Sequence, residues 1–137
     1  MLFRSSQIWS TYLGGSSNEF PQSLIVNDAN ELFVYGSTAS SNFPITAGCY
    51  DPSFNGGSLV SVTSVEFTGG SDIYVARLSA DGSALLGSTF VGGSGNDGLN
   101  VAADLHYNYG DHARGEIILD LDGGPIEIGR ASCRERV

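Results

Sequence analysis

Acidic and amide side chains in three short turns are the residues of this chain whose types and spacing best suit chemistry. The turns are Asn27–Glu31, Asn96–Asp97 and Asp120–Gly123. Oxygen ligands two residues apart can bind Ca²⁺, so a calcium-stabilised surface module is one hypothesis. None of the turns completes a D-x-D-x-D-G loop, and turns closed by an Asn or Asp side chain explain each of them. We therefore expect no cofactor, and we keep Ca²⁺ as an alternative.

A second set of candidate metal ligands lies in one polar loop that contains both histidines of the chain. The set is Asp104, His106, Asp111 and His112. Its spacing matches no zinc pattern, and solvated loop residues explain it more simply. We expect no metal site here.

Two glycine-rich stretches invite comparison with catalytic and nucleotide-binding motifs. Ser16 and Ser94 each follow Gly-Gly, but neither is part of a complete G-x-S-x-G nucleophile elbow. Gly93–Gly98 fits G-x-G-x-x-G, yet a phosphate site would need a helix to begin there. The matching stretch Gly15–Phe20 keeps only the first of these glycines. The glycines therefore indicate turns, and we expect no catalytic residues.

The charge balance limits the partners that this chain can have. Six arginines and no lysine stand against 15 acidic residues, giving a net charge of −9 and a pI near 4.3. Nucleic acids and anionic membranes need a cationic face, so neither is an expected partner. No apolar run approaches the roughly 20 residues that span a bilayer.

One motif occurs twice and organises the whole chain. Thr11–Glu19 reads TYLGGSSNE and Thr89–Asp97 reads TFVGGSGND, 78 residues apart. Aromatic, aliphatic and acidic positions match in order, which is typical of a repeat architecture.

Strand-like segments surround both copies of the motif. Alternating or short apolar runs bounded by turn residues predict strands, and no capped helical period exceeds two turns. The predicted strands are 8–13, 23–26, 31–38, 72–78, 84–91, 99–103 and 116–121, with an inserted hairpin within about 58–71. We also align 99–103 with the Leu24 strand, and 116–121 with Glu31–Tyr35. The fold class is therefore all-β.

Residues 128–137 differ abruptly from the rest of the chain. They contain three of the six arginines, and their back-translation matches a common short-read sequencing adapter. We expect a first repeat unit over 1–85, a truncated second unit over 86–126 and a non-native tail over 127–137. Cys49 would then be the one native cysteine, without a disulfide partner, and we expect it to be small and buried.

Four ordered motifs resemble the seven-bladed β-propeller repeat family. They are Trp9–Ser16 (WSTYLGGS), Leu32–Ser40 (LFVYGSTAS), Asn42–Pro44 (NFP) and Asp72–Leu78 (DIYVARL). The resemblance implies blades of four antiparallel strands, here an incomplete propeller of about one and a half blades. In this family one strand ends in the pattern G-x-T-x-S, which is Gly36–Ser40 in the first unit. The second unit lacks a recognisable ending of this kind.

The resemblance also implies a secreted or surface-exposed bacterial protein without defined catalytic residues. We expect a structural or adhesive scaffold that binds its missing blades and possibly extracellular proteins or glycans. A propeller hydrolase or lyase with its active site outside this fragment is the alternative, and the calcium-stabilised module is the second. Trp9 and Tyr12 are expected to pack between blades rather than to bind sugars.

Overall fold

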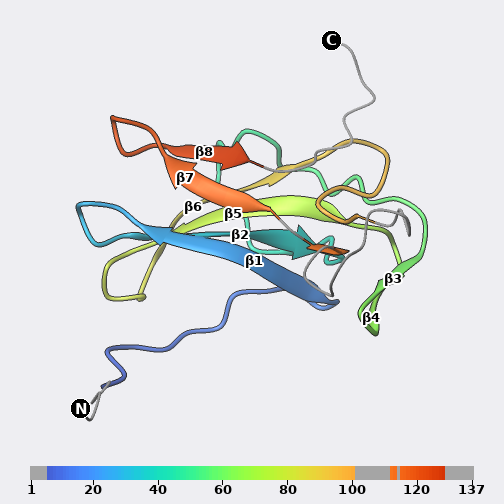
Figure 1. Ribbon diagram of the computed structural model, residues 1–137, viewed down its shortest axis with the longest axis horizontal. Helices are drawn as coiled ribbons and strands as arrows, with labels where there is room; N and C mark the ends of the chain where they lie inside the picture. Colours follow the sequence, from blue (N-terminus) through green and yellow to red (C-terminus); the bar gives the residue numbers. More distant parts are fainter. Residues whose placement is uncertain (1–5, 101–111, 114, 129–137) are drawn as a thin grey trace.

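The computed structural model of this protein describes residues 6–100, 112–113 and 115–128. This part of the chain contains eight β-strands and no α-helix (Figure 1), so the all-β prediction is confirmed. The strands are β1 (Glu19–Val26), β2 (Leu32–Thr38), β3 (Val60–Val62), β4 (Val65–Phe67), β5 (Asp72–Leu78), β6 (Leu85–Val91), β7 (Glu116–Leu119) and β8 (Pro125–Ile128).

Four of these strands form one antiparallel sheet in the order β1-β2-β5-β6. Each strand pairs with its neighbour along the chain once the β3–β4 hairpin is set aside, which is the topology of a propeller blade. The β7–β8 pair forms a separate two-stranded sheet, and the sheets of the described residues form no closed ring. The described residues therefore form an incomplete propeller, as the sequence predicted.

The edge strand β1 begins four residues earlier than predicted, and the additional residues include a proline. Phe20 and Pro21 belong to the strand, and its pairing with β2 shifts register between Pro21 and Ser23. A proline at a bulge of an edge strand leaves no ladder hydrogen bond unmade. The chain therefore keeps pairing through a residue that usually ends a strand.

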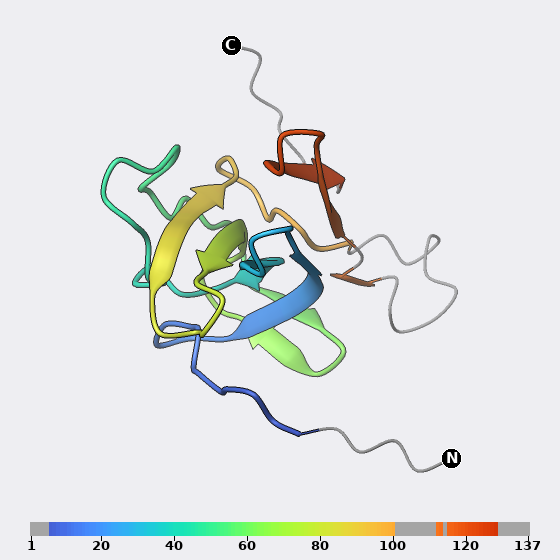
Figure 2. The same cartoon turned by 90° about the vertical axis from the view of Figure 1, so that its left-hand side faces the viewer.

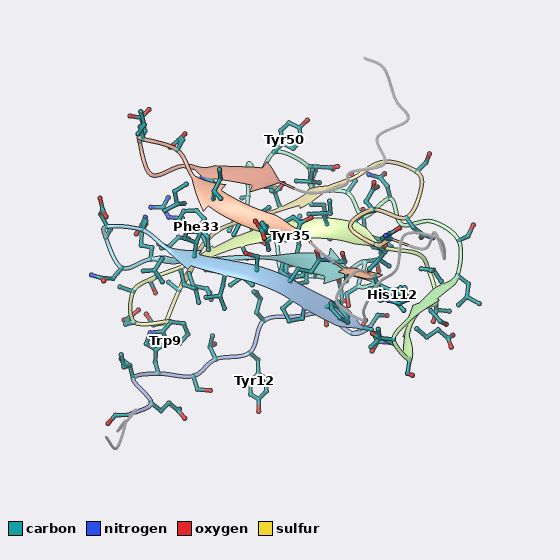
Figure 3. All side chains as sticks on the ribbon, viewed as in Figure 1. Trp9, Tyr12, Phe33, Tyr35, Tyr50 and His112 are labelled. Atoms are coloured by element: carbon teal, nitrogen blue, oxygen red, sulfur yellow. The ribbon has the colours of Figure 1, made fainter. Side chains whose placement is uncertain are left out.

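The predicted strand over Ile8–Leu13 is wrong, because this stretch is not a strand and pairs with no strand of the described residues. Ile8 is 92% exposed and Tyr12 is fully exposed, and Figure 3 shows Tyr12 pointing away from the sheet. Only Trp9 and Leu13 are partly buried. The alternation of β-forming residues was read correctly, but a strand also needs a neighbour for its backbone groups.

The inserted hairpin is confirmed as β3 and β4, joined by Thr63 and Ser64. Both joining residues have positive φ, 47° and 70°, as a two-residue hairpin turn requires. Val62 and Phe67 are fully buried and pack with Ala39 and Leu99. The insertion thus has a small core of its own at one end of the sheet.

The two faces of the four-stranded sheet bury different layers, because successive side chains of a strand alternate. On one face, Phe33, Tyr35 and Ile73 pack against Ile117 of β7. On the other, Tyr74, Ala76 and Phe90 pack with Phe43 and Phe54 of the 39–57 loop, and Leu13 joins them. Figures 1 and 2 show the amino-terminal segment and the β7–β8 hairpin on opposite sides of the sheet.

The β7–β8 turn repeats the β1–β2 turn bond for bond. The Asn27 Oδ1 accepts from the backbone N–H groups two and four residues later, at 3.0 and 2.9 Å. The Asp120 Oδ1 accepts from the same two positions at 3.0 and 2.7 Å. Asn30 and Gly123, each three residues into its turn, have φ of 60° and 77°. β7 is therefore the counterpart of β1, and β8 that of β2.

This equivalence corrects the alignment of the second unit. We aligned Glu116–Leu121 with Glu31–Tyr35 of β2, but its strand leads into the turn as β1 does. The predicted strand 99–103 lies mostly outside the described residues, and Leu99 and Asn100 are not in a strand. The alignment was wrong because the polar stretch before β7 was taken as the counterpart of the β1–β2 turn, whereas that counterpart follows β7.

Candidate functional site

Two carboxylates close the turns that lead into and out of the four-stranded sheet. At the first copy of the motif, the Gly15 N–H donates to Glu19 Oε1 at 3.1 Å. At the second copy, the Gly93 N–H donates to Asp97 Oδ2 at 2.8 Å. The two acids occupy matched positions of the repeat, so the duplicated sequence makes a duplicated hydrogen bond. We call Glu19 and Asp97 the turn-closing carboxylates.

Glu19 also connects the motif to the end of β2. Its Oε1 accepts from Thr38 Oγ1 at 3.0 Å and from Ser40 Oγ at 2.5 Å. Thr38 and Ser40 are the polar residues of the G-x-T-x-S pattern and are fully buried. Buried hydroxyl groups need such partners, because an unpaired polar group in the interior is costly. The pattern is therefore structural, holding one turn against another.

Asp72, the first residue of the D-x-Y-V strand, is a buried acid with a strongly raised pKa. It is fully buried, and its carboxylate accepts from the Asn55 N–H at 2.6 Å and the Gly56 N–H at 2.9 Å. Burial raises its pKa to about 6 against the pull of these two hydrogen bonds, and the charges of Asp97 and Asp51 add to the rise. A perturbed carboxyl is a candidate functional group.

The surroundings of Asp72 give it a structural role. Both of its oxygens face backbone N–H groups of the 55–56 loop, and a Cβ at Gly92 would lie 3.0 Å from Oδ1 and 2.9 Å from Asp97 Oδ2. The two carboxylates thus flank the Gly-Gly step of the second motif. This close approach explains why that position carries glycine, since a side chain would displace both acids.

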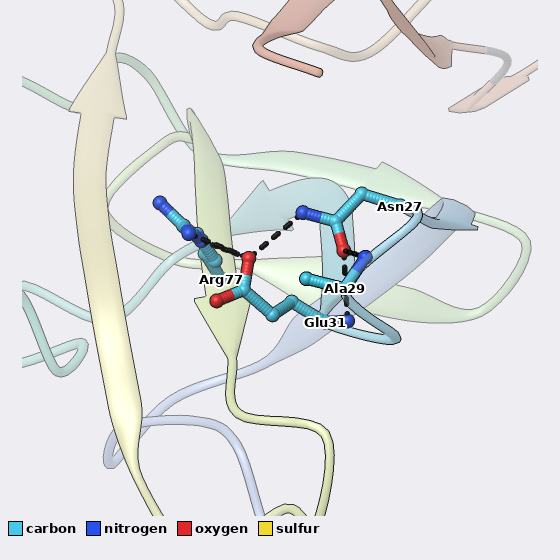
Figure 4. A network of polar contacts seen from close by, with 4 residues as sticks. All are labelled: Asn27, Ala29, Glu31 and Arg77. Carbon is cyan, nitrogen blue, oxygen red and sulfur yellow. Dashed lines mark hydrogen bonds and ion pairs between the residues drawn. The ribbon is translucent and has the colours of Figure 1, made fainter.

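Glu31 and Arg77 form an ion pair at the opposite end of the sheet (Figure 4). Glu31 Oε2 accepts from Arg77 Nε at 2.9 Å, from Arg77 Nη2 at 2.5 Å and from Asn27 Nδ2 at 2.7 Å. Hydrogen bonds from Asn27 and then Arg77 lower the pKa of Glu31. The Arg77 guanidinium also lies over the Phe33 ring, 5.6 Å from its centre.

Two of the three candidate calcium turns meet at this end of the sheet, around an open groove of about 580 Å³. Its lining includes Asp28, Arg77, Asp120 and Asp122. The side chains of Asn27, Glu31 and Asp120 are already used in hydrogen bonds within their turns or with Arg77. The third turn, Asn96–Asp97, lies with Asp72 and Ser71 instead.

No group of three or more His, Cys, Asp or Glu side chains among the described residues is placed to hold a metal ion. Of the loop candidates, Asp104, His106 and Asp111 lie outside the described residues. His112 is described and half-buried, and its carbonyl accepts from the Asn100 N–H at 2.7 Å. The predicted absence of a metal site in this loop and the calcium alternative for the three turns are both untested.

The glycine-rich stretches are turns, as the sequence predicted. Between Gly93 and Gly98 no helix begins, and Gly98 has a φ of 73° beside the Ser37 side chain. Ser16 is exposed and donates to Asn42 Oδ1 at 2.9 Å, and Ser94 is exposed as well. Among the described residues, neither hydroxyl hydrogen-bonds to a histidine.

Three other singled-out residues lie at the surface or near it. The Trp9 indole donates to the Ala80 carbonyl at 2.9 Å, and its ring covers Gly82 in the β5–β6 turn. Tyr12 is fully exposed. Cys49 was expected to be buried, but it is half-buried and free, and it lines a cavity of about 270 Å³.

Sequence reasoning singled out the motif but missed the roles of Glu19, Asp72 and Asp97. The available signal was positional: an acid follows each Gly-Gly-Ser-x-Asn, and another begins the strand after Gly69-Gly70. Glycine pairs beside an acid mark close backbone approach to a carboxylate. That signal indicates turn closure rather than catalysis.

A scan against protein-family models found no match for this chain, and searches of curated proteins and of solved structures found none either. In the described residues no helix is long and apolar enough to cross a membrane.

Proposed function

We propose that this chain is a repeat segment of a non-catalytic β-propeller scaffold, in which each sheet stabilises its neighbours. The observation that carries the proposal is the duplicated closure of the motif turn by Glu19 and Asp97. One copy leads into the four-stranded sheet and the other leads out of it. A unit whose entry and exit share one geometry can be joined to further units of its kind.

The packing of the sheet supports the same proposal. The β7–β8 hairpin, the start of the next unit, packs on one face through Ile117 and Leu119. The segment before the sheet contributes Leu13 to the opposite face. Both faces therefore receive pieces of neighbouring units, as the blades of a propeller do.

We propose that such a scaffold serves a secreted or cell-surface bacterial protein and binds other proteins or glycans through its loops. The resemblance of four ordered motifs to the seven-bladed propeller repeats and the strongly acidic charge support this proposal. Binding of a panel of extracellular proteins and glycans to the lengthened chain described next would test it.

The scaffold is tested by lengthening the chain by one repeat. A second copy of 14–91 inserted after Val91 keeps the sequence of the motif junction and adds one sheet. We expect one cooperative transition with a higher midpoint, because the added unit buries faces of both neighbours. A matched chain with about ten Gly and Ser residues at the junction should show no such gain.

An inserted unit that unfolds separately, at the midpoint of the parent chain, would contradict the repeat scaffold. Differential scanning calorimetry of the two lengthened chains and the parent chain distinguishes these results.

A further inference from the structure

The two copies of the motif have nearly the same sequence but different structures. In the second copy, Thr89–Val91 is the end of β6, and Phe90 is 1% exposed. In the first copy, Thr11–Leu13 is not a strand, and Tyr12, the counterpart of Phe90, is fully exposed. A buried aromatic position in one copy is thus open to solvent in the other.

The local turn does not cause this difference. Both copies form the bond from the second glycine to the acid four residues later. A Cβ at Gly14 would lie 2.8 Å from the Glu19 carboxylate, and one at Gly92 would lie 2.9 Å from that of Asp97. The two copies share nearly the same sequence and the same turn bond, so the difference between strand and non-strand lies in the neighbouring strand. β6 pairs with β5, whereas no strand of the described residues pairs with Ile8–Leu13.

The partner of β6 indicates the partner that the first copy lacks. Tyr74 of β5 lies opposite Phe90, and Val75 lies opposite Thr89. β5 itself has β2 on one edge and β6 on the other, so it offers Ile8–Leu13 no free edge. The missing neighbour is therefore a second strand of the β5 kind.

We propose that Ile8–Leu13 is a donor strand that docks, antiparallel, on the free edge of another three-stranded sheet of this repeat type, opposite a D-x-(aromatic)-V strand like β5. The inference rests on the proposed repeat scaffold and specifies which strand pairing connects two of its units. Each unit then receives its outermost strand from the segment that precedes the next unit in sequence.

The position of the donor segment fits this joint. Leu13 packs into the cluster that contains Tyr74 and Phe90, on the face opposite β7–β8. Leu24 of β1 lies on the same face, because it pairs with Val34, which packs against that cluster. The Leu24 side chain is 67% exposed. A sheet completed by Ile8–Leu13 would lie beside this face and cover exposed apolar surface, which isolated monomers rarely keep.

Side-chain fit can be tested within the chain by giving β6 the sequence of the donor segment. Four substitutions suffice, because Ser88 and Thr89 already match: L86I, G87W, F90Y and V91L. A Cβ at Gly87 would meet only Arg77 Cβ, at 4.0 Å, and the adjacent cavity of about 270 Å³ has room for the indole. We expect this grafted chain to keep its sheet by circular dichroism and its cooperative unfolding.

A register-shifted graft is the matched control. Placing the sequence of Gln7–Tyr12 at 86–91 moves every side chain to the other face. This control should lose cooperative unfolding. A four-substitution graft that loses its sheet as the shifted graft does would overturn the proposal.

Docking itself is tested with an acceptor version of the full chain. Ser88 N donates to Thr46 and Phe90 N to Asp51, on the outer edge of β6, so the N–H of Thr89 faces β5. T89P therefore weakens β6 pairing and frees the β5 edge. The acceptor also carries T11P, so that it cannot donate, and W9F, so that it contributes no tryptophan signal.

Trp9 of the unmodified chain is then the only tryptophan in the mixture. Titration with the acceptor should shift its fluorescence to shorter wavelength and saturate. A T11P donor should bind at least about tenfold more weakly, because a ladder hydrogen bond is lost. An S10P donor is the matched control. Its N–H would face away from the acceptor's β5, as that of Ser88 does, so the S10P donor should bind more tightly than the T11P donor.

Equal binding by the T11P and S10P donors, or no binding by the unmodified chain to an acceptor that keeps its sheet, would overturn the donor strand. If the acceptor chain loses its sheet, the four-substitution graft decides whether the proposal stands. Neither failure affects the repeat scaffold, which stands or falls on the lengthened chain.

Discussion

Asp72 is a carboxyl group that the fold encloses and uses to hold the 55–56 loop. Its two oxygens each accept from a backbone N–H group, of Asn55 and of Gly56. Asp72→Asn places an NH₂ group against one of these N–H donors. We expect a loss of about 1–3 kcal/mol in the free energy of unfolding, measured with urea. Asp28→Asn, at an exposed turn position, should change it by less than about 0.5 kcal/mol.

The raised pKa of Asp72 makes this loss depend on pH. Its folded pKa of about 6 exceeds the ordinary 3.8, so the folded state binds the proton more tightly than the unfolded chain does. Ionisation of Asp72 therefore costs stability, by up to about 3 kcal/mol, as pH rises from about 4 through 6. The advantage of the unmodified chain over Asp72→Asn should shrink over that range. A constant difference from pH 4 to pH 8 would contradict the assignment to Asp72.

At the scale of elements, the β1–β2 and β7–β8 turns demand a left-handed residue at their fourth position. Asn30 has a φ of 60° and Gly123 a φ of 77°. Asn30→Val should lower the free energy of unfolding by about 1–2 kcal/mol, because a branched side chain disfavours this conformation. Asn30→Gly should be close to neutral, since the second turn already uses glycine there. Thermal unfolding of the two variants measures the difference, and equal losses would contradict the turn assignment.

At the scale of the whole molecule, β1 is an edge strand with exposed apolar side chains. Leu24 is 67% exposed and Val26 51%, both on one face of the strand. Exposed apolar edges promote association, so we expect the isolated chain to be aggregation-prone. Leu24→Lys with Val26→Lys should reduce light scattering of concentrated solutions without changing stability by more than about 0.5 kcal/mol.

The control for this prediction lies on the opposite edge of the sheet. Leu86 of β6 is 45% exposed, but residues 46–51 already cover that edge through backbone hydrogen bonds to Ser88 and Phe90. Leu86→Lys should therefore leave the scattering unchanged. Light scattering of the unmodified chain no higher than that of the doubly substituted chain would contradict the expected aggregation.

Much of the fold followed from local pattern. β2, β5 and β6 were each predicted within one residue, and the β3–β4 hairpin lies inside the predicted stretch 58–71, because apolar alternation bounded by turn residues specifies strands locally. The glycine-rich stretches were recognised as turns for the same reason. The role of Asp72 was not predicted, since burial of a carboxyl depends on residues 55–56 and 97, which are distant in sequence.

The sequence by itself determined the all-β class, the meander of strands and the repeated motif, because these depend on side-chain period and turn chemistry within short stretches. Only the tertiary structure decided which copy of the motif becomes a strand and which strand of the first unit β7 corresponds to. Ile8–Leu13 and Leu86–Val91 have matching patterns, yet only the second has β5 beside it. A strand is completed by a neighbour's backbone, and the presence of that neighbour is not encoded in the strand's own residues.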